Sequence, residues 1–446
     1  MGKLKIRLSH TQILALGFVL LITAGTLLLT LPAASADGHA TPFSEALFTA
    51  TSASCVTGLV VRDTATHWSL FGQAIILILI QAGGLGIMTF VTFVYLALGK
   101  RIGLRERQIM SESINTSSIG GIVAMTKMIL TGTVFFELSG AALLSIRFIP
   151  EFGFGRGLWM SFFHSISAFC NAGFDLLGKG NEYISFCDYS ADPLVNLTLM
   201  GLITVGGIGF VVWDDVRRHG LKLRRYRLQS KIVLASSLVL TFGGAALFFL
   251  FERNATGAGL PLGERILTAL FDAVTPRTAG FNTTDTAALS TPSLILTYVM
   301  MFIGGGTGST AGGVKSTSVV VLLAFAFAGA GRKQHASIFC RRLSEENLKS
   351  ALYVVCGNIL AVITGAMAIG ALQPIAIRDL LFECFSAVGT VGMTTGVTRD
   401  LLPLSRLIIC LLMLIGRVGS VSFALAVMEK KARPPVTYPT ESINVG

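Results

Sequence analysis

Four stretches of this 446-residue chain share one pattern: a short helical run with phenylalanine and small residues, then a glycine followed by an apolar residue. The third reads A-L-F-D-A-V-T-P-R-T-A-G-F over Ala269–Phe281. Such a run is too short to span a bilayer, which needs about 20 residues, and too apolar for a solvent-exposed loop. The other three stretches are Ala46–Leu59, Phe163–Phe174 and Leu381–Met393. We expect the four loops to meet on one axis and to line an ion pathway.

A second glycine element follows each of these stretches. It reads G-G-x-G in three cases, beginning at Gly83, Gly206 and Gly305, and G-R-V-G in the fourth, beginning at Gly416. From the loop glycine to the first glycine of this element the distance is 25, 33, 25 and 24 residues. This agreement in register predicts an internal repeat of four units, each a span, a re-entrant helix with its loop, and a second span.

Composition places these units in a membrane. The chain is 52% hydrophobic and 13% charged, whereas soluble domains carry roughly a quarter charged residues. The net charge of +11 arises largely from basic clusters at 3–7, 100–107, 217–231, 332–349 and 430–433. Cytoplasmic loops that obey the positive-inside rule explain these clusters better than nucleic-acid binding. The apolar run 13–31 is long for a signal peptide, so we expect an uncleaved first span with both termini cytoplasmic.

The predicted fold is all-α integral membrane: four parallel span–pore-helix–span repeats around a pseudo-fourfold central pore, with eight transmembrane helices and four re-entrant loops. The repeats are parallel because each crosses twice and so begins and ends on the same side. The expected spans are 12–31, 73–98, 122–149, 193–216, 232–251, 292–328 with an interruption, 348–372 and 404–427. The expected pore helices end near residues 55, 170, 274 and 388, and Thr41 before Pro42 is typical of an N-cap. The repeats occupy 8–108, 109–228, 229–342 and 343–430, and the tail 431–446 is expected to form a dimer contact.

The four loops suit a selectivity filter. A cation that crosses a bilayer exchanges its water shell for protein oxygens, and inward-pointing backbone carbonyls supply them. Such backbone requires φ above zero, where glycine costs least, and the preceding helix aims its negative end at the same point. Packing glycines would explain one isolated loop, but not four in register. The predicted filter residues are Val56, Thr57, Gly58, Asn171, Ala172, Gly173, Thr278, Ala279, Gly280, Thr390, Val391 and Gly392.

The motifs resemble a known superfamily. They include V-T-G-L at Val56–Leu59, F-C-N-A-G-F at Phe169–Phe174, V-T-P-R-T-A-G-F-N at Val274–Asn282 and the closing tripeptide 437–439. Over nearly its whole length the chain is similar to the Trk/Ktr/HKT potassium transporters, most of all to the membrane subunit of bacterial Ktr systems. The resemblance implies potassium as the ion at the filter carbonyls when all four glycines are present. A serine in the first loop accompanies sodium transport in some plant relatives, and this chain has Gly58 there.

The resemblance also implies partners and a location. Two such chains would form a homodimer in a bacterial plasma membrane, each with its own pore. They would sit on a cytosolic octameric ring of a KtrA-like RCK protein that binds ATP or ADP, and often cyclic di-AMP. This chain itself is expected to bind no cofactor, and whether sodium activates transport stays open. Membrane lipid is the other expected partner, and nucleic acid is not one.

The glycine-rich run within the third unit interrupts a span. A helix cannot persist through so many glycines, so we expect a flexible intramembrane loop, which the resemblance identifies as a gate below the filter. A nucleotide-binding P-loop is excluded because Val314 separates the glycine from the lysine. A plain hinge or a close-packing site is the alternative. The predicted gate residues are Gly304, Gly305, Gly306, Thr307, Gly308, Ser309, Thr310, Ala311, Gly312, Gly313, Lys315 and Arg417.

Arg417 replaces the second glycine of the repeated element in the last unit. Burying an arginine at mid-membrane depth costs about 2.5–3.5 kcal/mol on insertion scales, so a function is expected. We predict that Arg417 reaches the pathway beneath the filter, where it holds the gate loop or sets an electrostatic barrier. The alternative is an ion pair that joins helices, with Glu383 or Asp272 as the partner. The same two roles, at the gate or in an ion pair between helices, are open for Lys315.

Together these features predict channel-like potassium uptake driven by the membrane potential. The sequence shows no carboxylate pair at catalytic spacing and no nucleophile motif, so we do not expect an enzyme. One rival function is a sodium- or proton-coupled symporter, which would need buried mid-membrane carboxylates or inverted repeats. The others are a sodium-selective relative of the same superfamily and a membrane-embedded enzyme or scaffold.

Overall fold

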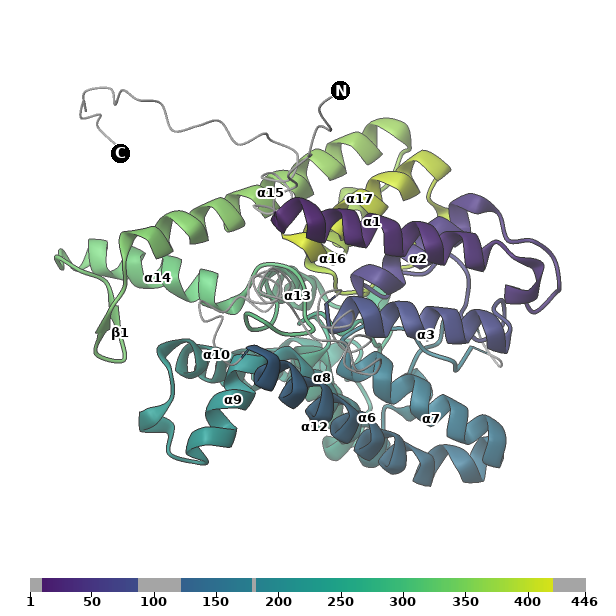
Figure 1. Ribbon diagram of the computed structural model, residues 1–446, viewed down its shortest axis with the longest axis horizontal. Helices are drawn as coiled ribbons and strands as arrows, with labels where there is room; N and C mark the ends of the chain where they lie inside the picture. The colour runs from purple at the N-terminus through teal and green to yellow at the C-terminus, as the bar shows by residue number, and fades with distance from the viewer. Residues whose placement is uncertain (1–9, 87–121, 179–181, 420–446) are drawn as a thin grey trace, which may run out of the picture.

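The computed structural model describes residues 10–86, 122–178 and 182–419. Over these ranges the chain is mostly helical, with one two-stranded hairpin formed by β1 Ser337–Ile338 and β2 Arg341–Arg342. The helices surround a centre into which loops run (Figure 1). The predicted helical class is confirmed.

The helices form four successive sets, here called units 1 to 4. Unit 1 comprises α1 His10–Leu29, α2 Phe43–Cys55 and α3 Leu70–Gly84. Unit 2 comprises α6 Ile122–Phe152, α7 Phe154–Phe169, α8 Pro193–Gly207 and α9 Phe210–His219. Unit 3 comprises α10 Leu228–Leu238, a π-helical turn Val239–Gly243, α11 Gly244–Phe251, α12 Leu262–Val274, α13 Thr291–Phe302 and α14 Ser316–Ala330. Unit 4 comprises α15 Glu345–Leu372, α16 Ile377–Gly389 and α17 Pro403–Val418.

Each unit begins with a helical segment that is long and apolar enough to cross a membrane. These segments are Gln12–Leu29, Val123–Phe152, Leu228–Asn254 and Glu345–Leu372. Large apolar side chains on them are exposed, among them Leu20, Phe135 and Leu360, as expected of a lipid-facing surface. The chain is therefore a multi-pass membrane protein.

The second span of each unit is short or broken. Within the described residues, α3, α13, α14 and α17 have 12 to 16 residues each, and α8 meets α9 at a bend of 93°. The span expected over 193–216 is bent at its glycine element, where α8 ends at Gly207 and Gly209, with a φ of 95°, precedes α9. In the part of the chain that the structure describes, four helical segments, or five if the bent pair is one span, are long and apolar enough to cross a membrane, so the eight crossings stay a prediction.

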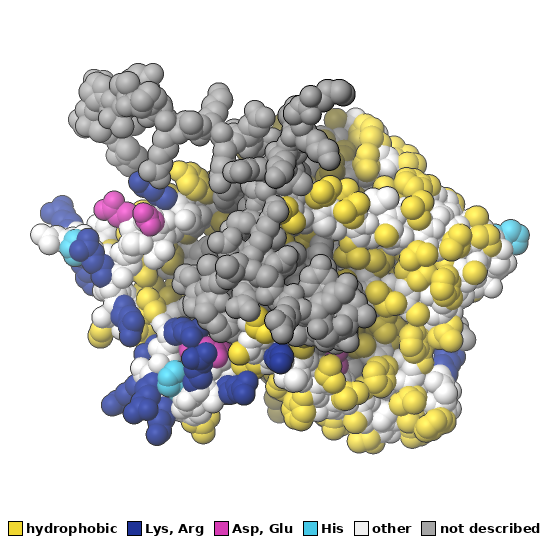
Figure 2. All heavy atoms as spheres, viewed as in Figure 1, with side chains coloured by type: hydrophobic (Ala, Val, Ile, Leu, Met, Phe, Trp, Pro, Cys, Tyr) yellow, Lys and Arg dark blue, Asp and Glu magenta, His cyan; other side chains and the backbone are white. Residues whose placement is uncertain are grey.

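Charge and apolar surface separate along the molecule. Hydrophobic side chains cover much of the body, whereas Lys and Arg gather at the end formed by α9 and the β1–β2 hairpin (Figure 2). Two of the five predicted basic clusters lie at this end, 217–231 and 332–349. The other three basic clusters lie outside the described residues. So do three further predicted features: the repeat boundaries at 108 and 430, residues 87–98 of the second span, and the tail 431–446.

The units contact one another in chain order. The helix that follows the loop in each unit packs against the helix that precedes the loop in the next unit: α3 on α7, α8 on α12, α13 on α16, and α17 back on α2. The circle closes because the fourth unit returns to the first. This arrangement brings the C-terminal ends of α2, α7, α12 and α16 toward one place.

Candidate ion pathway

The four predicted filter loops form a closed ring. A Cβ atom added to Gly58 would lie less than 3.0 Å from the carbonyl oxygen of Ala172, and one on Gly173 equally close to that of Ala279. The same holds from Gly280 to Val391 and from Gly392 back to Thr57. Each loop glycine therefore faces the backbone of the next unit, and any larger side chain would push the ring apart.

The backbone of the four loops repeats the same conformation. In each tripeptide the first residue and the glycine both have positive φ, in a region that residues other than glycine rarely adopt. The first residues are Val56 at 57°, Asn171 at 58°, Thr278 at 74° and Thr390 at 50°. The glycines are Gly58 at 91°, Gly173 at 70°, Gly280 at 80° and Gly392 at 95°. Holding β-branched residues in this region costs free energy, which surrounding contacts must offset.

Buried hydroxyl groups supply part of that support. The Gly58 N–H donates to Ser52 Oγ at 3.1 Å, and the Gly392 N–H donates to Ser386 Oγ at the same distance. In units 2 and 3 the hydroxyl is the donor instead, from Ser167 to the carbonyl of Phe174 and from Thr275 to that of Phe281. We did not predict these residues, although a Ser or Thr five or six positions before each loop glycine is visible in the sequence.

Polar side chains in the pore helices also hold the segments that follow the loops. His164 Nε2 accepts from the Leu176 N–H at 2.9 Å. Asp272 accepts from the hydroxyl of Thr284 at 3.0 Å, and Glu383 accepts from the hydroxyls of two threonines in its own unit. The two carboxylates therefore bind groups of their own units, and no sequence pattern predicts this role for any of the three side chains.

The predicted gate loop lies directly beneath the ring. A parallel bridge between Ile303 and Val314 closes its base, with the Gly304 N–H donating to the carbonyl of Val314 at 2.8 Å. At the far side a Cβ on Gly312 would collide with the side chain of Thr390 in the fourth filter loop. The loop thus lies directly against the ring of four loops.

Backbone hydrogen bonds attach the loop to the glycine elements of two neighbouring units. The Gly306 N–H donates to the carbonyl of Gly207 at 2.8 Å, and the Phe210 N–H donates to that of Gly308 at 2.7 Å. The Gly313 N–H donates to the carbonyl of Gly416 at 3.3 Å. The repeated element therefore does more than bend a helix, because its glycines leave backbone groups free to bind the loop.

Arg417 joins three units through carbonyl oxygens. Its guanidinium donates to the carbonyls of Thr310 in the loop and of Gly83, and to that of Gly84 at 3.0 Å. The alternative ion pair with Glu383 or Asp272 is wrong, because those carboxylates bind threonines. Lys315 likewise holds the loop, with Nζ 2.6 Å from the carbonyl oxygen of Ala311.

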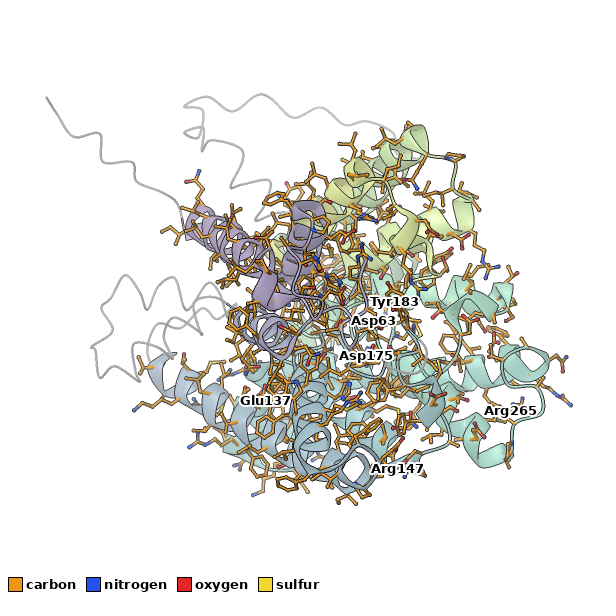
Figure 3. All side chains as sticks on the ribbon, turned by 90° about the vertical axis from the view of Figure 1, so that its right-hand side faces the viewer. Asp63, Glu137, Arg147, Asp175, Tyr183 and Arg265 are labelled. Carbon is orange, nitrogen blue, oxygen red and sulfur yellow. The ribbon has the colours of Figure 1, made fainter. Side chains whose placement is uncertain are left out.

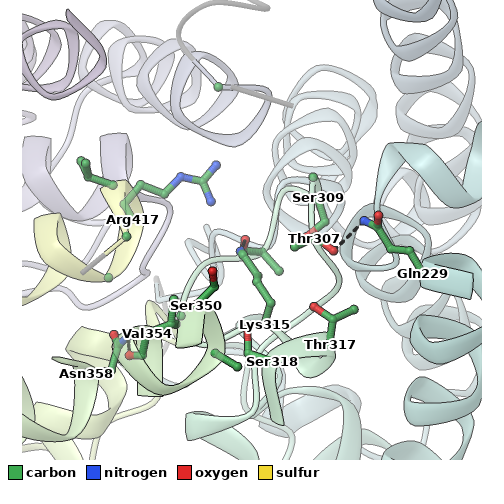
Figure 4. A pocket seen from close by; sticks show the side chains of 18 of the residues that line it. Gln229, Thr307, Ser309, Lys315, Thr317, Ser318, Ser350, Val354, Asn358 and Arg417 are labelled. Carbon is green, nitrogen blue, oxygen red and sulfur yellow. Dashed lines mark hydrogen bonds between the residues drawn. The ribbon is translucent and has the colours of Figure 1, made fainter. Parts of the chain in front are cut away.

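Two cavities lie on opposite sides of the ring and loop. The outer one, about 400 Å³, is lined by the four filter glycines and by acidic residues that include Asp63 and Asp175, which lie near Tyr183 (Figure 3). The inner one, about 620 Å³, is lined by the loop, Lys315 and Arg417 (Figure 4). The two share no lining residue: the four ring glycines line the first, and residues of the loop line the second.

The glycine loops form a ring between two cavities, and the surrounding helices expose apolar side chains. These features together define a membrane transport protein. The chain belongs to the TrkH family of cation transport proteins, whose sequence profile matches residues 6–433. The family consists of transporters and not of enzymes.

Two relatives match over almost their whole length. The potassium/sodium uptake protein NtpJ of Enterococcus hirae is 40% identical, over 99% of this chain and 98% of the relative. The Ktr system potassium uptake protein B of Bacillus subtilis is 38% identical, over the same shares. The potassium transporter TrkH of Vibrio parahaemolyticus, a crystal structure, shares the fold with a TM-score of 0.74 at 18% identity. That match covers 96% of this chain and 86% of the other.

Proposed function

We propose that this protein takes up potassium through a channel-like pore with a pseudo-fourfold axis, and that the ring of four loops is its selectivity filter. The observation that carries the proposal is the closed ring of four loops. In every loop the first residue of the tripeptide and its final glycine both have a positive φ. The relatives suggest the ion, because two of them, 38% and 36% identical, are Ktr system potassium uptake proteins B. Carbonyl oxygens of the twelve filter residues would replace the water shell of the ion.

The membrane potential would drive uptake without a catalytic step. It supplies about 2.3 kcal/mol per charge per 100 mV, hence about 3.5 kcal/mol at roughly −150 mV. That free energy sustains a potassium gradient of several hundredfold. The acidic residues of the outer cavity would raise the local cation concentration at the entrance.

The loop 304–313 would act as the gate. It lies between the two cavities, and Arg417 and Lys315 hold it through carbonyl oxygens. Both side chains also place positive charge beneath the filter, where it opposes the exit of a cation. Opening then requires the loop to leave the pathway, which its hydrogen bonds to Gly207, Phe210 and Gly416 resist.

Regulation would come from other polypeptides. Relatives named as Ktr system proteins imply a multi-subunit system, so we propose a homodimer on a cytosolic RCK ring that binds ATP or ADP, or cyclic di-AMP. The basic end formed by α9 and the hairpin offers a charged surface toward such a ring (Figure 2).

Sodium transport or sodium activation is the competing proposal. The relative from Enterococcus hirae is named for both ions. In addition, Glu137 of α6 is buried beside α3, where Gln81 Nε2 donates to it at 3.3 Å, and a buried carboxylate is what a coupled transporter needs.

Rubidium uptake into proteoliposomes that contain only this protein separates these proposals. Passive uptake that needs no sodium gradient, and that rises when 304–313 is deleted, supports the gated pore. Uptake that requires a sodium or proton gradient would replace the pore with a coupled transporter. The variant Glu137→Gln tests for coupling, since it should abolish uptake only if transport is coupled to a sodium or proton gradient.

A further inference from the structure

The first turn of α10 touches both the gate loop and the basic end of the protein. Gln229 Nε2 donates to Thr307 Oγ1 at 2.7 Å (Figure 4). The next residue, Ser230, faces the other way and donates its hydroxyl to Asp215 Oδ2 at 2.6 Å. Two consecutive residues thus connect the intramembrane loop to α9.

Asp215 is fixed in place. It is fully buried, and its Oδ2 also accepts from the backbone N–H of Arg227 at 2.9 Å. The Arg227 guanidinium lies 2.9 Å from Asp214 Oδ2, and Arg218 pairs with the same carboxylate at 2.7 Å. The end of α9 and the start of α10 are therefore joined as one charged cluster next to the exposed residues Arg224 and Arg225 of the basic end.

The contact between α10 and the loop is close but easily broken. A Cβ on Gly306 would lie 2.9 Å from Val233 Cγ1, so the helix packs directly on the loop. Gln229 and Thr307 are only partly buried and line the inner cavity, where water can satisfy both groups once they separate. Arg417, in contrast, makes a charge-assisted hydrogen bond to the loop carbonyl of Thr310, and such a bond is stronger.

We propose that the first turn of α10 is a releasable latch on the gate loop, with Gln229 as the positioning residue, and that it transmits movement of the basic end to the gate. The inference rests on the proposed function, in which the loop 304–313 blocks the pathway. Arg417 would be the fixed attachment of the loop, and the bond from Gln229 to Thr307 the one that opens first.

The test is rubidium uptake into proteoliposomes with the full-length protein carrying Gln229→Leu, Thr307→Val, or both. One net hydrogen bond shifts a two-state equilibrium roughly 2- to 12-fold, so each single variant should raise uptake within that range. The double variant should equal the single ones, because both remove the same bond. Thr307→Ser keeps the hydroxyl and should behave as wild type.

A second arm tests transmission from the basic end. Ser230→Ala separates α10 from Asp215 and should raise uptake in the same direction. Ser236→Ala is the matched control on the same helix, because its hydroxyl bonds only to the carbonyl of Val233 within α10, and it should change nothing.

Deletion of 304–313, measured in the same assay, distinguishes a failure of the proposed latch from a failure of the proposed gate. If the deletion raises uptake while Gln229→Leu and Thr307→Val do not, the latch is wrong and the gate stands. If the two single effects multiply in the double variant, the residues act independently and the latch is also wrong. If the deletion leaves uptake unchanged, the gate itself is wrong.

Discussion

The guanidinium of Arg417 donates a hydrogen bond to the backbone carbonyl of Thr310, so a side chain of unit 4 holds the intramembrane loop of unit 3. The same group also binds the carbonyl of Gly84 in unit 1 at 3.0 Å. This half-buried cation thus binds neutral oxygens from two other units, so its position depends on all three units.

Arg417→Ala should raise passive rubidium uptake. Hydrogen bonds to charged groups contribute about 1.5–3 kcal/mol each, so losing the attachment to Thr310 should shift the gate toward open by at least about tenfold. Arg417→Lys should restore only part of the closure, because one ammonium cannot reproduce the planar guanidinium contacts. The exposed hairpin variant Arg341→Ala is the control. Uptake in Arg417→Ala at or below the wild-type level would contradict this account.

Ser386→Ala should weaken the filter without closing the pore. The Gly392 N–H would lose its acceptor, and an unsatisfied buried donor costs about 1–3 kcal/mol. We expect a lower Tm and a reduced preference for potassium over sodium in flux assays. Ser145→Ala, whose hydroxyl bonds within its own helix, should alter neither. Unchanged selectivity in Ser386→Ala would show that the hydroxyl supports stability alone.

Two glycines of α8 offer a matched pair. A Cβ on Gly206 would collide with the carbonyl oxygen of Phe169 at the end of the pore helix, whereas one on Gly201 meets nothing within 4 Å. Gly206→Ala should therefore destabilise the protein by about 1–3 kcal/mol. Gly201→Ala should stabilise it by up to about 1 kcal/mol through helix propensity. Thermal unfolding in detergent checks both, and equal Tm shifts would mean that the close approach does not matter.

Sequence patterns predicted elements within one unit better than contacts between units. The third pore helix is expected to end near residue 274, and α12, Leu262–Val274, ends there, because helical periodicity is a local signal. Thr41, in contrast, is not the N-cap of α2. Its hydroxyl lies 3.1 Å from His67 Nε2, and Pro42 takes the cap position instead. The partner of Thr41, His67, lies 26 positions further along the chain, so no local sequence pattern predicts this contact.

The same limit explains the errors at the candidate site. Arg417 was expected to find a carboxylate or the loop, and the loop proved to be its partner together with α3. The hydroxyls of Ser52 and Ser386 stood at matching positions in the sequence, yet their role follows from the backbone turn that brings the loop N–H back to the helix. The latch residue Gln229 carried no signal, since its partner Thr307 lies in a different part of unit 3.

The ring of four glycines is the central claim, and the reversal potential of purified protein in a planar bilayer with potassium on one side and sodium on the other tests it most directly. Wild type should reverse close to the potassium equilibrium potential, and Gly58→Ser should move the value toward that of sodium. Gly38→Ser also places a serine at a positive φ, 69° against 91° at Gly58, but there an added side chain meets nothing within 4 Å, so it should leave the value unchanged. A wild-type protein that does not distinguish the two ions, or a Gly58→Ser variant that matches it, would contradict the four-loop filter.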